Sequence, residues 1–248
     1  MRNLHNLTLH LRKKGGNRII DGTYIQNEIL LYMQQLHSFT FCISTYTDIQ
    51  NLSHTLAQEN LNNGHGDTVS IVNYFNLSAV VCSIFSLPFV FRYLVDIGNR
   101  FPDVVFSHVT YLFVRDIHAF RHEFFVRIAR SFPLLNRLRI SNIIAQPLPD
   151  LLASSFGHPQ SHSMIEYPHL ASLDVTLGHA AYLEQFLNET KAYVPCLTKL
   201  TVRHSDLKIV TENFTREATR RNCAKVKEIT FFLQPDNPED YSHYFPSL

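Results

Sequence analysis

A short sequence pattern, which we call the frame, occurs several times in this chain and limits the folds that it can adopt. The frame reads apolar, Pro, any, Leu, any, any, Leu, any, branched aliphatic, and its three copies begin at Phe132, Tyr167 and Val194. Within each copy, apolar and other residues alternate as in a strand with one buried face. Because one frame at three places indicates one structural unit used repeatedly, the chain is expected to fold as an array of repeats.

Without its proline the frame becomes L-x-x-L-x-L, with other apolar residues in some Leu positions, and it recurs along the whole chain. The copies begin at Leu4, Leu36, Leu77, Val109, Leu135, Leu170, Leu197 and Val226. The spacing averages about 32 residues, because seven steps cover the 222 residues from the first copy to the last. A period of this length indicates a solenoid, in which each repeat stacks on its neighbours.

Segments with helical periodicity lie between these strands. They span residues 23–33, 47–59, 89–101, 118–132, 179–194 and 207–221. Alternating strands and helices predict right-handed crossovers and a parallel sheet. We therefore expect an α/β solenoid whose curved parallel sheet forms the concave side, with the helices outside. The predicted array covers residues 1–233 with about eight repeats, and residues 234–248 form a C-terminal tail with the composition of a flexible end.

The L-x-x-L-x-L copies resemble the leucine-rich repeat of the ribonuclease-inhibitor-like type, and most of all the repeat region of F-box/leucine-rich-repeat proteins. This resemblance implies the substrate-recognition region of an F-box-type ubiquitin ligase subunit, which does no chemistry itself. Where the family pattern has Asn or Cys, this chain has Arg12, Ile143, Gly178 and Ser205. The sequence has no F-box-like segment, and nothing caps its first strand. A Skp-type adaptor is therefore expected only through an F-box upstream of this chain.

The predicted binding surface follows from strand geometry. In L-x-x-L-x-L the leucines face the core, so the alternate residues face the concave side. The predicted protein-binding residues are Tyr111, Phe113, Arg115, Arg137, Arg139, Asp174, Lys199 and Arg203. Tyr and Arg dominate the energetics of protein interfaces, and unpaired Arg suits an acidic or phosphorylated partner. The alternative is a solvated sheet face on which Arg stems cover the aromatic rings.

Composition argues against several classes of partner. The formal net charge of +1 gives no global field for nucleic acid or an acidic membrane. The most apolar run, residues 80–95, contains Pro88 and Arg92 and is too short to span a bilayer. The four cysteines are far apart and the N-terminus has no signal-peptide core, so free thiols and a cytoplasmic or nuclear location are expected.

No catalytic, metal or cofactor site is predicted. The motifs G-x-S-x-G and G-x-G-x-x-G are absent, and His118 and His122 stand in the order H-x-x-x-H-E, which is not the zinc-protease order. The run Arg12-Lys13-Lys14 lacks Walker spacing and is interpreted as a solvated turn.

Three alternatives to the ligase hypothesis stay open. The first is an interaction scaffold with no link to ubiquitin. The second is an α/β enzyme with dispersed site residues. The third is a secreted receptor ectodomain with glycans at sequons such as Asn188 or Asn213.

Overall fold

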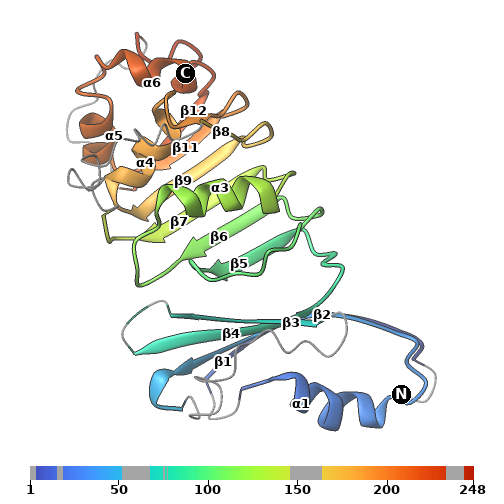
Figure 1. The fold of residues 1–248 in the computed structure, drawn as a ribbon. Coiled ribbons are helices and arrows are strands. Elements are labelled where there is room, and N and C mark those ends of the chain that lie inside the picture. Colours follow the sequence, from blue (N-terminus) through green and yellow to red (C-terminus); the bar gives the residue numbers. More distant parts are fainter. Residues whose placement is uncertain are drawn as a thin grey trace, which may run out of the picture.

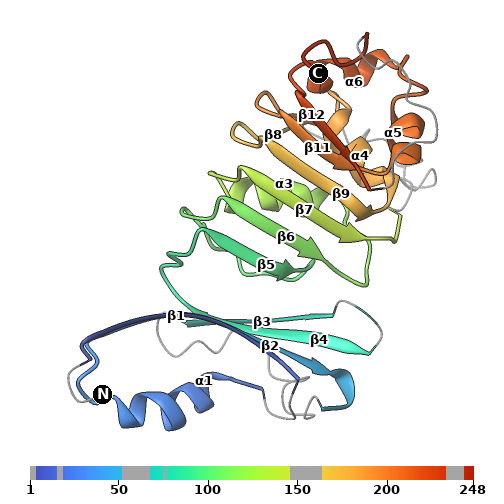
Figure 2. The same ribbon diagram turned by 180° about the vertical axis from the view of Figure 1, so that it is seen from behind.

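The computed structural model describes residues 4–15, 19–51, 68–74, 76, 78–145, 164–232 and 243–248. It is a mixed α/β fold with a six-stranded parallel sheet and a four-stranded mixed sheet (Figure 1). The mixed sheet lies beside one end of the parallel sheet, and both views agree on this arrangement (Figures 1 and 2). The α/β class and the parallel sheet are therefore confirmed. The single array of about eight strands is wrong, because its strands are divided between two sheets.

Neighbours along the chain are neighbours in the parallel sheet. Its strands are β5 (Tyr93–Ile97), β6 (Tyr111–Arg115), β7 (Arg137–Asn142), β9 (Ser172–Gly178), β11 (Lys199–Val202) and β12 (Glu228–Phe231). The second apolar residue of each repeat pairs with its counterpart in the next strand. These residues form one row: Leu112, Leu138, Leu173, Leu200 and Ile229. The repeated frame therefore keeps strands of different repeats in register.

Residues 89–101 do not form the predicted helix, because β5 lies there. Tyr93 pairs with Tyr111 and Leu94 with Leu112, so β5 extends the row by one strand. A short apolar run fits a buried strand as well as a buried helix, and here β-branched residues and sheet packing favour the strand. The register shifts at Asp96, whose φ is 60°, so the end of β5 departs from regular pairing.

The described helices of the C-terminal half lie on one face of the parallel sheet (Figure 1). They are α3 (His122–Ser131), α4 (Ala180–Leu187), α5 (His204–Val210) and α6 (Glu217–Cys223). Phenylalanines fill the layer between helices and sheet. The fully buried Phe125 packs edge-on against Phe186 at 5.4 Å and against Phe124 at 5.3 Å between ring centroids. Close aromatic packing of this kind anchors the helices to the sheet.

The helix predictions for residues 118–132 and 179–194 are confirmed with shorter bounds. The first helix begins at His122, and the second ends at Leu187. The helix predicted over residues 207–221 is two helices, α5 and α6. Glu212, Asn213 and Phe214 have positive φ values, which a right-handed helix cannot contain.

Two short elements complete this half. Strands β8 (Ile165–Glu166) and β10 (Ala192–Tyr193) pair in parallel. The predicted tail ends in a packed segment, because Tyr244 and Phe245 are buried. The Tyr244 hydroxyl donates to the carbonyl oxygen of Arg216 at 2.7 Å, just before α6.

The mixed sheet has the order β1-β2-β4-β3. Its strands are β1 (Asn6–Lys14), β2 (Ser38–Asp48), β3 (Thr68–Tyr74) and β4 (Ala79–Ser86). β1 and β2 are parallel and keep the predicted register, with Leu7 opposite Phe39. β4 is antiparallel to both β2 and β3. A parallel array cannot continue through antiparallel strands, so the motif copies at Leu4, Leu36 and Leu77 do not join the parallel sheet.

A helical segment connects β1 to β2, as predicted for residues 23–33. It consists of α1 (Gly22–Tyr24), the π-turn η1 (Ile25–Ile29) and the 3-10 turn η2 (Leu30–Tyr32). The helix predicted over residues 47–59 is not present at its start, because β2 runs to Asp48 and a 3-10 turn, η3 (Ile49–Asn51), follows. The rest of that prediction lies outside the described residues.

The two sheets share one hydrophobic core. Phe85 of β4 packs edge-on against Phe89 and Phe106, with ring centroids 5.2 and 5.9 Å apart. The side-chain amide of Asn73, on β3, donates to the carbonyl oxygens of Asp96 at 3.1 Å and Arg115 at 2.7 Å. The mixed sheet is therefore held against the β5 end of the parallel sheet.

Polar side chains also link the turns that follow the strands. The Asn142 amide donates to the carbonyl oxygen of His118 at 2.7 Å, and Asp116 accepts from the backbone N–H of Asn99 at 2.6 Å. Asn142 stands four residues after Leu138, one position before the place where the family pattern has Asn or Cys. A turn-to-turn link therefore exists without the expected residue at the expected position.

Candidate functional site

A groove of about 1130 Å³ lies on the face of the parallel sheet opposite the described helices, where β5, β6 and β7 meet the mixed sheet. Figure 2 shows this side of the sheet. We call it the basic groove. Its lining residues are Arg12, Lys14, Tyr46, Arg92, Tyr93, Val95, Asp96, Thr110, Tyr111, Phe113, Arg115, Leu134, Asn136, Arg137, Arg139 and His169.

The basic groove concentrates positive charge. Six of its lining residues are cationic, namely Arg12, Lys14, Arg92, Arg115, Arg137 and Arg139. Asp96 is the one carboxylate among the lining residues. The chain as a whole has a formal net charge of only +1, so this local excess is hidden in the composition. A concave surface of one charge sign focuses the electric field and attracts ligands of opposite charge.

Strand register places the arginines beside aromatic rings. Tyr111 pairs with Arg137, and Phe113 pairs with Arg139. The Arg137 guanidinium carbon lies 5.3 Å from the Tyr111 ring centre, and that of Arg139 lies 5.2 Å from the Phe113 ring centre. These cation–π contacts hold the guanidinium groups over the sheet. Arginine stems thus cover the aromatic rings while their charged ends line the groove.

The buried carboxylate of Asp96 joins the sheets at the groove floor. The Asp96 side chain is 3% exposed, and one of its oxygens lies 2.5 Å from Nε of Arg115. The Tyr46 hydroxyl donates to the other oxygen, and Nη2 of Arg12 lies 4.0 Å from it. Burial, and then the hydrogen bond to Asp96, raise the pKa of Tyr46, so its hydroxyl keeps the proton that it donates. Asp96 therefore neutralises Arg115 and connects β1, β2, β5 and β6.

The structure brings together five of the eight predicted binding residues. Tyr111, Phe113, Arg115, Arg137 and Arg139 all line the basic groove. Asp174 lies next to it, with Oδ2 3.3 Å from Nε of Arg139.

Lys199 and Arg203 do not line the groove. Nζ of Lys199 lies 2.5 Å from Oε1 of Glu228. Arg203 donates to Asp206 and to the carbonyl oxygen of Gly178, each at 2.7 Å. Both side chains are engaged in local ion pairs farther along the sheet.

Several groove residues were not predicted. Arg12 and Lys14 belong to the basic run interpreted as a solvated turn, but they lie on β1 and line the groove. Arg92 and Tyr93 lie in the segment predicted as a helix. The run Tyr93-Leu94-Val95 is apolar throughout, so its sequence fits a strand as well as a helix. Tyr46 carried no local signal, because only the packing of the two sheets brings it to Asp96.

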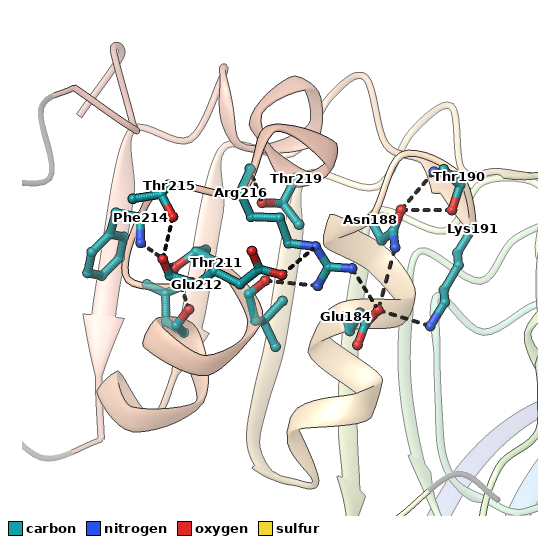
Figure 3. Close-up of polar contacts among 12 residues, drawn as sticks. Glu184, Asn188, Thr190, Lys191, Thr211, Glu212, Phe214, Thr215, Arg216 and Thr219 are labelled. Carbon is teal, nitrogen blue, oxygen red and sulfur yellow. Dashed lines mark hydrogen bonds and ion pairs between the residues drawn. The ribbon is translucent and has the colours of Figure 1, made fainter. Parts of the chain in front are cut away.

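A second polar cluster lies on the helix side (Figure 3). Glu184 accepts hydrogen bonds from Arg216 at 3.2 Å and from Lys191 at 3.3 Å. Burial by itself would raise the pKa of Glu184, but Lys191 and Arg216 together lower it below its usual value. The cluster ties α4 to the segment before α6. Because its charges are compensated within the cluster, it is a structural contact.

The described residues contain no group of three or more His, Cys, Asp or Glu side chains placed to hold a metal ion. Burial raises the pKa of Cys42, Cys82 and Cys223 to about 12 each, so these thiols stay protonated. A protonated thiol is a poor nucleophile. Among the same described parts of the chain, no helix has the length and apolar character to cross a membrane.

Comparison of the chain with protein-family models, with curated proteins and with solved structures finds no match. The geometry and charge of the basic groove therefore carry the functional argument.

Proposed function

We propose that this protein is a binding protein whose basic groove holds an acidic segment of a partner protein. The observation that carries the proposal is the excess of charge, six cationic residues around one buried carboxylate. That carboxylate pairs with Arg115 at 2.5 Å and lies 4.0 Å from Arg12, so one negative charge faces six positive charges and an excess remains. Tyr and Arg on a preformed concave surface are the residue types that contribute most to protein interfaces.

We further propose that residues 93–231 form a leucine-rich-repeat-like solenoid with the basic groove on its concave side. The in-register parallel strands and the helices on one face support this architecture. Repeat arrays need terminal units that cover their exposed core. In this proposal the mixed sheet serves as that cover at the β5 end.

The side chains that line the basic groove favour binding without catalysis. The groove contains no cysteine, and its one carboxylate is held in an ion pair with Arg115. A catalytic carboxylate or thiol needs access to the reacting atoms and a matched pKa. Among the described residues, the groove therefore offers the enzyme alternative no thiol and no unpaired carboxylate, and its other candidate groups are Lys14, Thr110, His169 and the tyrosines.

The narrower proposal is that the protein selects substrates for an F-box-type ubiquitin ligase. It rests on the resemblance of the L-x-x-L-x-L repeats and on the binding groove. If it holds, the chain joined to its upstream coding sequence will co-purify with a Skp-type adaptor, and the chain alone will not. Co-purification of neither form with an adaptor would favour a scaffold that has no link to ubiquitin.

Affinity purification from native cells with a matched pair of variants tests the groove itself. In Arg137→Glu/Arg139→Glu, two groove cations become anions without disturbing the Arg115–Asp96 pair. In Arg100→Glu/Arg121→Glu, the same change of charge is made at exposed residues that do not line the groove. We expect partners lost with the first variant and retained with the second. If both variants recover the same partners as the unmodified chain, the groove is not the binding site.

A further inference from the structure

The basic groove has features that select one kind of acidic group. Five of its six cationic residues are arginines and one is a lysine. Arginine presents a rigid, planar fork of N–H donors that matches the oxygens of phosphate or carboxylate, whereas lysine acts as a point charge.

The arginines of β7 keep donors available for a ligand. Arg137 is exposed, and among the described residues no carboxylate forms an ion pair with it. Arg139 also lines the groove, and it contacts Asp174 through Nε at 3.3 Å, so the contact with Asp174 does not use its two terminal nitrogens. Both guanidinium groups are held by ring contacts at 5.2–5.3 Å, so little side-chain freedom is lost on binding.

The spacing of these two arginines suits one compact dianion. Arg137 and Arg139 are two residues apart on β7, and alternate residues of a strand lie about 6.6 Å apart on the same face. One group with several acceptor oxygens can contact both forks, whereas a carboxylate offers only two oxygens and one charge. A phosphorylated side chain carries about two negative charges and three acceptor oxygens.

The same contacts disfavour the stacking of nucleic-acid bases on Tyr111 and Phe113. Nucleic acids bind such grooves by stacking bases on exposed aromatic rings. Here the rings of Tyr111 and Phe113 have guanidinium groups over them. A base could stack on either ring only by displacing an arginine.

We propose that the basic groove recognises a phosphorylated segment of the partner, with Arg137 and Arg139 holding the phosphate. This inference rests on the proposed function, because it names the group that the groove selects within an acidic partner. Arg115 is not assigned to the phosphate, because it pairs at 2.5 Å with the buried Asp96, whereas Arg139 has a longer contact with the more exposed Asp174. Arg92 and Lys14 line the same groove and are placed to contact acidic residues that flank the phosphate.

The test uses the full chain and fluorescein-labelled degenerate peptide pools, with phosphoserine, phosphothreonine or phosphotyrosine at the centre. The same pools without phosphate, and a single-stranded oligonucleotide, are the comparison ligands. Fluorescence anisotropy is expected to show at least about tenfold tighter binding of one phosphorylated pool than of its unphosphorylated counterpart. Arg137→Glu/Arg139→Glu should abolish the difference, and Arg100→Glu/Arg121→Glu should retain it.

A conservative variant distinguishes the effect of guanidinium geometry from that of positive charge. It also controls for loss of folding. Arg137→Lys/Arg139→Lys keeps both charges and is expected to weaken phosphopeptide binding by about threefold to tenfold. Equal binding of phosphorylated and unphosphorylated acidic pools, lost in the Glu variant, would overturn the phosphate inference and leave the proposed function standing. Tighter binding of the oligonucleotide, or no binding of any pool, would overturn both.

Discussion

The parallel sheet and the mixed sheet contain the same L-x-x-L-x-L motif and end in different architectures. In the parallel sheet, Leu138 pairs with Leu112 on one side and Leu173 on the other, and all these strands run the same way. In the mixed sheet, Leu7 pairs with Phe39 in the same manner, but the next strand, β4, is antiparallel. The motif therefore specifies a strand and its buried face, while the direction of the next strand depends on what it packs against.

The two regions also differ in the size of their cores. The parallel sheet and its helices share one large cluster of buried residues, which extends to Cys42, Ile71 and Phe85 of the mixed sheet. Two further clusters of buried apolar residues, of five and three residues, lie at the mixed sheet and the segment that leads into α1. Because stabilisation grows with the apolar area buried, the mixed sheet is expected to open more easily.

The largest effect is expected from Phe125→Ala, in the main core. Phe125 is fully buried among aromatic rings, so its truncation should lower the free energy of unfolding by about 3–5 kcal/mol. Phe41→Ala, in the five-residue cluster of the mixed sheet, should cost about 3 kcal/mol, at the low end of the range, because its neighbours can relax. Urea unfolding followed by circular dichroism measures both. Equal losses of unfolding free energy would show that the two cores are packed equally well.

The junction between the regions is tested by Asp96→Asn. Asparagine tolerates the positive φ of 60° but leaves Arg115 without its buried counter-charge. We expect a loss of about 2–3 kcal/mol and a separate early unfolding transition for the mixed sheet. Asp48→Asn, at an exposed position at the end of β2, is the matched control. A single transition with unchanged midpoint would mean that Asp96 does not couple the sheets.

Thiol labelling compares the stability of the mixed sheet with that of the C-terminal helices, and it needs no mutation. Only Cys196 is exposed, so it should react first in native buffer. In rising urea below the main transition, Cys82 of the mixed sheet should react at least about tenfold faster than Cys223, the buried last residue of α6. Mass spectrometry of labelled peptides gives the order. If Cys223 reacts first, the C-terminal helices open before the mixed sheet does.

The polar cluster around Glu184, shown in Figure 3, tests how much ion pairs stabilise the helix layer. Glu184→Gln removes a charge paired with Lys191 and Arg216 and should cost about 1 kcal/mol at neutral pH. Because the pKa of Glu184 is lowered in the folded state, its contribution is present above the ordinary value of 4.5 and is lost as the pH falls through the folded value. Unfolding measured at neutral and acidic pH should show the variant and the unmodified chain converging in acid. A constant difference would assign the effect to packing.

The smallest effect on stability is expected from Arg137→Ala. Its guanidinium has a ring contact at 5.3 Å and, within the described chain, no ion pair, so the free energy of unfolding should change by less than about 0.5 kcal/mol. Binding of a phosphorylated peptide pool should fall sharply in the same variant. A stability loss as large as that of Asp96→Asn would make Arg137 a structural residue.

Prediction from sequence succeeded where local pattern and structure coincide. The row that contains Leu112, Leu138 and Leu173 follows from alternation and the repeat period, and so does the placement of Tyr111 opposite Arg137. It failed at β5, because the spacing to β6 is shorter than the repeat and a short apolar run fits either element. It also failed for Arg12 and Tyr46, whose place in the groove depends on contacts between distant segments.

The L-x-x-L-x-L pattern predicts the strands that contain it, the buried face of each, and the arginines beside aromatic residues on the other face. These features follow from side-chain alternation along one strand and from one repeated frame. The pattern does not predict β3 or β5. The place where the parallel array stops and the way the groove is closed depend on tertiary packing. Strand direction and the contacts of Asp96 depend on which distant surfaces pack together. A local sequence pattern does not specify this packing.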